Sequence, residues 1–131
     1  MENCVFCKIV LGKVPCYKIY EDEYVLAFLD IFPASKGQTL VIPREHRTDY
    51  VFNIEDSLYS KLFIISKKIT RAIDKAFNTE RTCLVIEGFE VGHPHIKLYP
   101  CYERRLNLRP MENKPSEEGF KKTAEEIKKL L

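Results

Sequence analysis

The chain has 131 residues, of which 45% are hydrophobic and 31% are charged, and its formal net charge is +2. This composition is typical of one folded domain and excludes the disordered and fibrous classes. The near-neutral charge argues against a strongly basic nucleic-acid-binding module, so no nucleic-acid partner is expected. The informative counts are five cysteines, three histidines and no tryptophan.

Targeting signals are not expected in this sequence. Residues 1–7 contain no basic stretch followed by an apolar run, so no signal peptide is predicted. No run of about 18 apolar residues occurs, so neither a transmembrane helix nor a membrane partner is predicted. An odd number of cysteines without a secretory signal does not favour a disulfide framework. We therefore expect a reduced, cytoplasmic protein whose cysteines are core residues, metal ligands or nucleophiles.

The first third of the chain predicts a short helix followed by strands. Residues 4–11 are expected to form a helical turn, which Gly12 ends. Aromatic and β-branched residues are enriched in the segments that follow, which is typical of strands. These strands are expected at residues 17–21, 24–29 and 39–43.

The middle of the chain changes to a helical period. From Leu58 to Ala76, apolar residues recur at spacings of three and four, which predicts one long amphipathic helix. Asn53 is expected to cap its beginning and Asn78 to end it. Two further strands are expected, at residues 82–87 and 93–99.

A final helix is predicted at residues 117–131, with Ser116 as its cap. Its acidic residues come early and its lysines late, which suits the helix dipole. The order of elements predicts an α+β fold. We expect an antiparallel five-stranded sheet that carries the short and long helices on one face, with the C-terminal helix in addition.

The segment His93-Pro94-His95-Ile96-Lys97 is the sharpest local motif. Alternate side chains of a strand share a face, so two imidazoles and an ammonium would point the same way. Gly88 and Gly92, just upstream, would allow backbone N–H groups to approach an anion. This set suits attack by an imidazole on a phosphorus centre. The alternative is a surface strand with polar residues outward.

A second motif, Cys4-x-x-Cys7, has the spacing of zinc ligands, but a structural site needs four. His46 and His93 are candidates for the missing pair. The alternatives are two cysteines in a helical turn, one of them packed inward, or a redox dithiol.

A third candidate site lies around Asp30, an acid at the end of a strand with apolar neighbours. Such a carboxylate can accept hydrogen bonds from ribose hydroxyls while apolar groups contact a base. A plain turn before Pro33 is the alternative.

Several segments, in the same order, are similar to the histidine triad (HIT) superfamily, in its bacterial-type branch of nucleotide hydrolases with a CxxC motif. They are CVFCKIV at 4–10, YEDE at 20–23, AFLDIFP at 27–33, GQTLVIPREH at 37–46 and HPHIKL at 93–98.

The resemblance implies a HIT-like domain over residues 1–108 and a C-terminal helical extension over 109–131. It implies hydrolysis of a nucleoside 5′-monophosphate derivative, of the phosphoramidate or dinucleotide type, through a covalent nucleotidyl-histidine at His95. The alternative is a nucleotidyl transferase or a non-catalytic purine-nucleotide-binding module. The implied partners are a purine mononucleotide or its derivative and a second copy of the chain, in a homodimer.

Taken together, the motifs and the resemblance assign three groups of residues. The expected catalytic residues are His95 and Lys97. The expected nucleotide-binding residues are Phe28, Asp30, Ile31, Gly88 and Gly92. The expected ligands of a structural Zn²⁺ are Cys4, Cys7, His46 and His93.

The sequence departs from the family pattern in two places. Lys97 stands where the third histidine of the triad is found, and as a point charge it can hold a phosphate oxygen. Its charge would also discourage protonation of His95. The loop before the triad is short and places Glu87 or Glu90 near the anion site.

Overall fold

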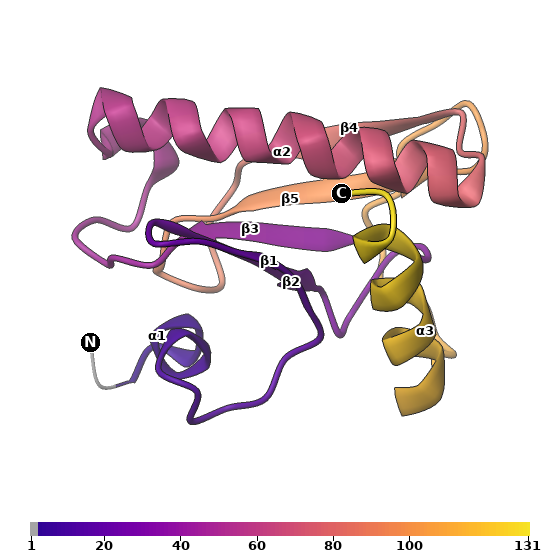
Figure 1. Ribbon diagram of the computed structural model, residues 1–131, viewed down its shortest axis with the longest axis horizontal. Helices are drawn as coiled ribbons and strands as arrows, with labels where there is room; N and C mark the ends of the chain where they lie inside the picture. Colours follow the sequence, from indigo (N-terminus) through magenta and orange to yellow (C-terminus); the bar gives the residue numbers. More distant parts are fainter. Residues whose placement is uncertain (1–2) are drawn as a thin grey trace.

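The computed structural model describes residues 3–131 and contains the order of elements that the sequence predicts (Figure 1). The five strands, the long middle helix and the C-terminal helix are all present. The elements are α1 (Val5–Val10), β1 (Lys18–Glu21), β2 (Val25–Leu29), β3 (Thr39–Pro43), the 3₁₀ turn η1 (Val51–Asn53), α2 (Asp56–Phe77), β4 (Arg81–Val85), β5 (Ile96–Cys101) and α3 (Glu117–Lys128).

The strands form one antiparallel sheet in the order β1-β2-β3-β5-β4. Helix α2 connects β3 to the edge strand β4, and β5 then returns to fill the place between them. Every residue of β2 and β3 is buried. A strand that is apolar throughout needs cover on both of its faces.

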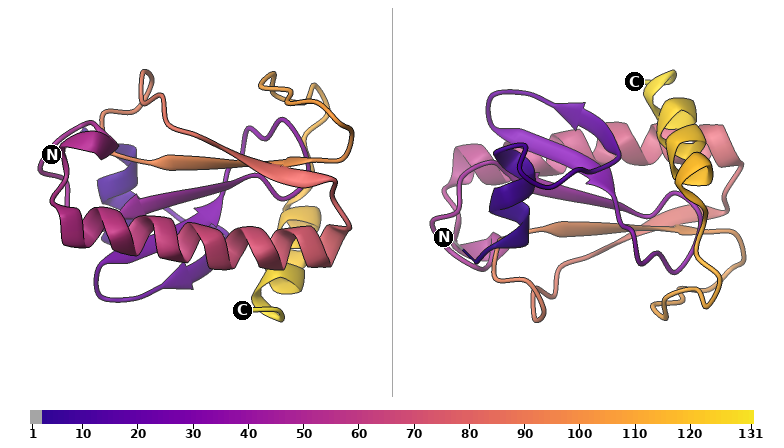
Figure 2. Two further views of the ribbon diagram at one scale, coloured as in Figure 1. Left: turned by 90° about the horizontal axis from the view of Figure 1, so that it is seen from above. Right: turned by 90° about the horizontal axis from the view of Figure 1, so that it is seen from below.

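The two faces of the sheet are covered by different helices (Figures 1 and 2). Val25, Ala27 and Leu29 of β2 share a core with the apolar faces of α2 and α3. The alternate residues Leu26 and Phe28 pack with α1 instead. The expectation that the helices lie on one face is therefore wrong for α1. The reason is the continuous apolar run of the central strands, which leaves no face polar enough for solvent.

Two predicted helix boundaries are confirmed and one is wrong. Asn78 ends α2 in the left-handed conformation, at φ 51°. Ser116 caps α3, and its side chain accepts a hydrogen bond from the backbone N–H of Gly119 at 3.1 Å. Asn53, the expected cap of α2, lies in η1, and Glu55 precedes the helix without a side-chain capping bond. The extra 3₁₀ turn shifts the start of the helix.

Strand β5 begins at Ile96 rather than at His93, because Pro94 has no N–H to donate to a strand neighbour. The alternation of faces from Ile96 onward follows the prediction. Ile96 and Leu98 belong to the core beneath α2. Lys97 lies opposite Leu40, which faces α1.

The C-terminal part folds back over the sheet. Phe120 of α3 is buried and stacks on Tyr17 with ring centroids 4.9 Å apart. The preceding segment, 102–115, crosses the end of β2, where the N–H of Met111 donates to the carbonyl of Pro33 at 2.8 Å. Among the described residues, no helix is long and apolar enough to cross a bilayer.

The turn before β3 depends on Gly37, and its replacement by alanine tests this. Gly37 has φ +91°, and an added Cβ would lie 3.1 Å from Cε2 of Phe77. We expect Gly37→Ala to lower the free energy of unfolding by about 2–3 kcal/mol. Gly12→Ala is the matched control, since Gly12 has φ +76° but would meet nothing within 4 Å. Its expected cost is about 1 kcal/mol. Equal losses in urea denaturation would contradict the steric role of Phe77.

Helix α1 is held on the sheet by Phe6, which is 7% exposed and contacts the apolar residues of β2 and β3. We expect Phe6→Ala to cost about 3–5 kcal/mol of unfolding free energy. Val5→Ala, on the neighbouring residue that is 41% exposed, should cost less than about 1 kcal/mol. Thermal and urea unfolding measure both. A cost for Phe6→Ala as small as that of the control would show that α1 is anchored by other contacts.

Candidate functional site

Two cysteines and two histidines converge where α1 meets the ends of β3 and the beginning of β5. Their ligand atoms all lie within 4.8 Å of one another. Cys7 Sγ lies 3.3 Å from His46 Nδ1 and 3.5 Å from His93 Nδ1. Cys4 Sγ lies 3.5 Å from His93 Nδ1 and also accepts the backbone N–H of Cys7, which caps α1. The predicted ligands are thus brought together from three separate parts of the sequence.

The orientation of the two imidazoles fits metal binding. Nε2 of His46 donates to the carbonyl of Gly92 at 2.8 Å, and Nε2 of His93 donates to the carbonyl of Pro43 at 2.7 Å. Each bond assigns the proton to Nε2 and leaves a lone pair on Nδ1, toward the sulfurs. Burial lowers the pKa of His93 to about 4, so its ring is neutral. Two thiols and two imidazoles are a donor set of closed, four-coordinate structural metal sites, so these residues can hold a metal ion.

His95 lies beside this cluster and is only 3% exposed. Its Nδ1 donates to the carbonyl of His93 at 2.7 Å, which leaves Nε2 unprotonated. Burial, reinforced by the charge of Lys97, lowers the pKa of His95 below its ordinary value. The rings of Phe6 and His95 pack in a T-shaped arrangement at a centroid distance of 5.3 Å. The result is a fixed, neutral imidazole, which is the form that acts as a nucleophile.

Lys97 and Glu87 form an ion pair next to this imidazole. Lys97 Nζ lies 2.9 Å from Glu87 Oε1, and the same oxygen lies 3.9 Å from His95 Nε2. Burial alone would lower the pKa of Lys97, but its contact with Glu87 outweighs burial and raises it. Burial would raise the pKa of Glu87, but Lys97 and the N–H of Phe89 lower it. Both groups are therefore charged at neutral pH.

A pocket of about 370 Å³ opens in front of His95 and Lys97. The predicted base-binding residues Phe28 and Ile31 line it, as does Asp30 at the end of β2. Its walls are largely apolar, and its polar groups are few. A concave, mostly apolar pocket with a few converging polar groups is typical of a small-molecule site.

Gln38 holds Asp30 in place, and the sequence analysis did not single it out. Nε2 of Gln38 donates to Asp30 Oδ2 at 2.8 Å, and Oε1 of Gln38 accepts the N–H of Ala34 at 2.6 Å. The N–H of Phe32 donates to the other carboxylate oxygen at 2.8 Å. Phe6, which packs on His95, has no role predicted from the sequence beyond its place in the helical turn and in the family-like segment at 4–10.

Gly88 and Gly92 are not among the described residues that line this pocket. Gly88 has φ +69° and forms the turn after Glu87. The carbonyl of Gly92 accepts the hydrogen bond from His46. Gly88 therefore shapes the loop, and Gly92 supports the Cys/His cluster. Their expected contact with an anion stays a prediction.

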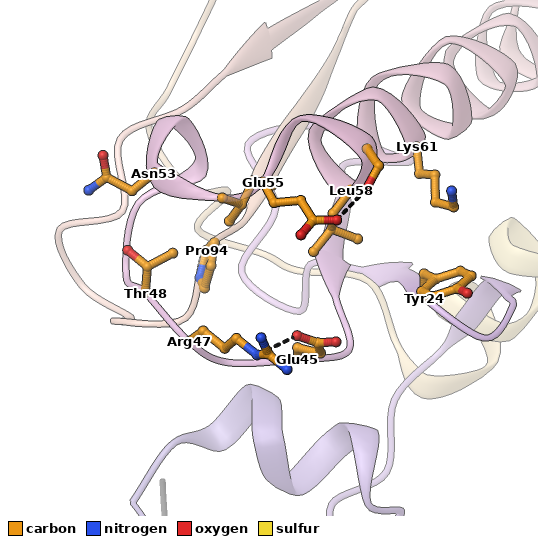
Figure 3. Close-up of a pocket in the computed structure, with 11 residues that line it drawn as sticks. Tyr24, Glu45, Arg47, Thr48, Asn53, Glu55, Leu58, Lys61 and Pro94 are labelled. Atoms are coloured by element: carbon orange, nitrogen blue, oxygen red, sulfur yellow. Dashed lines mark hydrogen bonds and ion pairs between the residues drawn. The ribbon is translucent and has the colours of Figure 1, made fainter.

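A second depression, of about 500 Å³, lies near the beginning of α2 (Figure 3). It is lined by polar side chains such as Glu45 and Arg47, which form an ion pair at 2.8 Å. Pro94 lines it, but none of the expected catalytic or nucleotide-binding side chains is among its described lining residues. The pocket in front of His95 is therefore the candidate functional site.

Comparisons with known proteins identify the family of this chain. Protein hit of Bacillus subtilis is 44% identical over 106 residues, which cover 77% of this chain and 72% of that protein. The adenosine 5′-monophosphoramidase of Schizosaccharomyces pombe is 39% identical over 99 residues, 75% of this chain and 74% of the enzyme. The crystal structure of a Zn-bound histidine triad family protein from Mycobacterium smegmatis has a TM-score of 0.82 at 26% identity, and the likeness covers 98% of this chain and 93% of that one. A family model for the HIT domain matches residues 12–103, and the chain therefore belongs to the HIT family.

Proposed function

We propose that this protein is a nucleotide hydrolase that cleaves a nucleoside 5′-monophosphate derivative, of the phosphoramidate or dinucleotide type, at its α-phosphorus. Membership of the HIT family supports a nucleotide hydrolase in general. The observation that carries the finer proposal is the buried, neutral His95, which lines this pocket and whose Nε2 is unprotonated.

Different residues of the pocket contact the base, the ribose and the phosphate. Phe28 and Ile31 contact the base, and Asp30, fixed by Gln38, accepts hydrogen bonds from the ribose hydroxyls. Lys97 holds a phosphoryl oxygen as a point charge in place of the third histidine of the triad. This arrangement would place the phosphorus next to Nε2 of His95.

Hydrolysis of a phosphoramidate then takes two steps. In the first, His95 Nε2 bonds to the phosphorus while the P–N bond breaks, and the leaving amine takes up a proton from solvent. In the second, water attacks the phosphorus, the N–P bond to His95 breaks, and the nucleoside monophosphate leaves while the proton of the water passes to solvent. Each step replaces one bond at phosphorus and is easier than direct attack by water.

The four donors Cys4, Cys7, His46 and His93 are proposed to hold a structural Zn²⁺. When bound, the ion supplies a cross-link between α1 and the two strands that flank the site. The side chain of His93 serves that cross-link, and its carbonyl orients His95. The bound metal ion would thus help to hold His95 in position and would take no part in the reaction.

The second candidate function is nucleotide binding without turnover. The ion pair between Lys97 and Glu87 favours it, because this pair stands where relatives have an imidazole. A nucleotidyl transferase would use the same covalent step with another acceptor. The homodimer and the cytoplasmic location stay predictions.

The enzymatic proposal is tested with adenosine 5′-phosphoramidate. We expect the wild-type protein to release AMP and His95→Asn to be at least about 1,000-fold slower, because the variant lacks the nucleophile. AMP binding, measured by calorimetry, should survive in the variant, and quenching in an alkaline denaturant, in which the P–N bond of a nucleotidyl-histidine is stable, should show the adduct in the wild type alone.

The outcomes separate the two candidate functions. If the wild-type protein binds AMP but does not form AMP from the phosphoramidate, the protein is a nucleotide-binding module without turnover. Release by His95→Asn at a rate near that of the wild type would contradict the covalent step at His95.

The zinc proposal is tested by elemental analysis after purification without a chelator. We expect about one Zn²⁺ per wild-type chain and a large loss in Cys7→Ser, with a lower thermal unfolding temperature, because a structural metal contributes folding free energy. Cys83→Ser is the matched control, since Cys83 is a free thiol in β4 outside the cluster. Equal zinc content in both variants would contradict the site.

A further inference from the structure

The carboxylate of Glu87 lies close to both Lys97 and His95. A single oxygen, Oε1, is 2.9 Å from Lys97 Nζ and 3.9 Å from His95 Nε2. This oxygen is shielded from solvent. An anionic oxygen is thus held between the two groups that are proposed to meet the phosphate.

A bound phosphate would need the same place. For attack by His95, the phosphorus must approach Nε2 to about 3–3.5 Å, which puts its oxygens about 3–4 Å from that nitrogen. One of these oxygens must also reach Lys97 Nζ. Glu87 Oε1 meets both conditions and so stands where a phosphoryl oxygen would bind. Two anionic oxygens repel each other at such short range, so the carboxylate and the phosphate exclude one another.

The surroundings of Glu87 allow it to leave. Its side chain is 27% exposed, and it lies just beyond the end of β4, directly before Gly88 with φ +69°. The carboxylate is held by Lys97, by the backbone N–H of Phe89, which donates to Oε2 at 3.1 Å, and by the backbone N–H of Gly88. A rotation of the side chain toward solvent would release Lys97.

We propose that Glu87 is a specificity-determining residue, which pairs with Lys97 until a phosphate displaces it and which selects against ligands with a second anionic group beside that phosphate. The inference rests on the proposed function, since it takes the α-phosphate site to lie at His95 and Lys97. After this rotation the carboxylate still lies at the solvent side of the bound phosphate. A further phosphate or sulfate group on the ligand would therefore be repelled by its negative charge. An uncharged or cationic substituent would not. Within the proposed function, Glu87 therefore favours a substrate of the phosphoramidate type over one of the dinucleotide type, in which a second phosphate adjoins the first.

The proposal is tested by titrating AMP, ADP and inorganic phosphate into the protein by calorimetry, with Glu87→Gln as the variant. The substitution keeps the shape of the side chain and removes its charge. We expect the variant to bind AMP and inorganic phosphate about tenfold more tightly than the wild type does, because Lys97 no longer has a competing partner. For ADP the gain should be larger still.

Glu90→Gln is the matched control. Glu90 lines the pocket in front of His95 and Lys97 and is exposed, and no ion pair with Lys97 is found for it among the described residues. Its substitution should change each affinity less than about twofold. Thermal unfolding of both variants tests whether either one is misfolded.

Several outcomes would overturn the proposal. Weaker binding in Glu87→Gln would mean that the carboxylate only positions Lys97, and equal gains in both variants would indicate a general charge effect. Equal gains for AMP and ADP would remove the selection against a second anion, and no binding of any ligand by any of the proteins would remove the site. If Glu87→Gln binds inorganic phosphate more tightly than the wild type does while no nucleotide binds, the displacement of Glu87 by phosphate is supported and the proposed nucleotide function is contradicted.

Discussion

The position of His93 is the constraint on which the site depends. Its Nε2 donates to the carbonyl of Pro43 at the end of β3, and its Nδ1 faces the sulfurs of Cys4 and Cys7. Its own carbonyl accepts the proton of His95 Nδ1. A fully buried imidazole must have its polar atoms satisfied, so this ring has little freedom. One residue therefore links α1, the end of β3 and the imidazole of His95, and it determines which nitrogen of His95 is free.

The charges of the site are balanced locally. Lys97 and Glu87 neutralise each other beside a neutral imidazole, so burial of this group costs less than burial of a single charge. Recognition of a mononucleotide, the proposed ligand, requires a few charged groups in one pocket and no extended basic surface. The small net charge of the chain, +2, agrees with a ligand that is recognised by a few groups inside a pocket.

The elements with strong local patterns could be predicted, while those set by distant partners could not. β3 coincides with the expected strand, and the helical spacing and Asn78 located α2 well. The Cys/His cluster could be expected because Cys4 and Cys7 have the spacing of zinc ligands and because the family resemblance implies the other two, His46 and His93. The face chosen by α1, the shift of the α2 cap from Asn53, and the contact of Glu87 with both Lys97 and His95 depend on tertiary packing, which no local pattern encodes. Gln38 was missed for the same reason, since its role appears only when the end of β2 meets the start of β3.

The segment after β5 has a consequence for how this protein can diversify. Leu108 and Pro110 form part of the pocket wall, and the neighbouring Met111 is tied to Pro33 by a backbone hydrogen bond. Leu108, Pro110 and Met111 lie beyond the family match at 12–103. The groups proposed for the chemistry are thus carried by the matched domain, whereas one rim of the pocket is carried by the segment that follows it. Insertions or substitutions in that rim can change which ligands fit the pocket without disturbing the core. Ligand selectivity and the stability of the fold can therefore change separately in evolution.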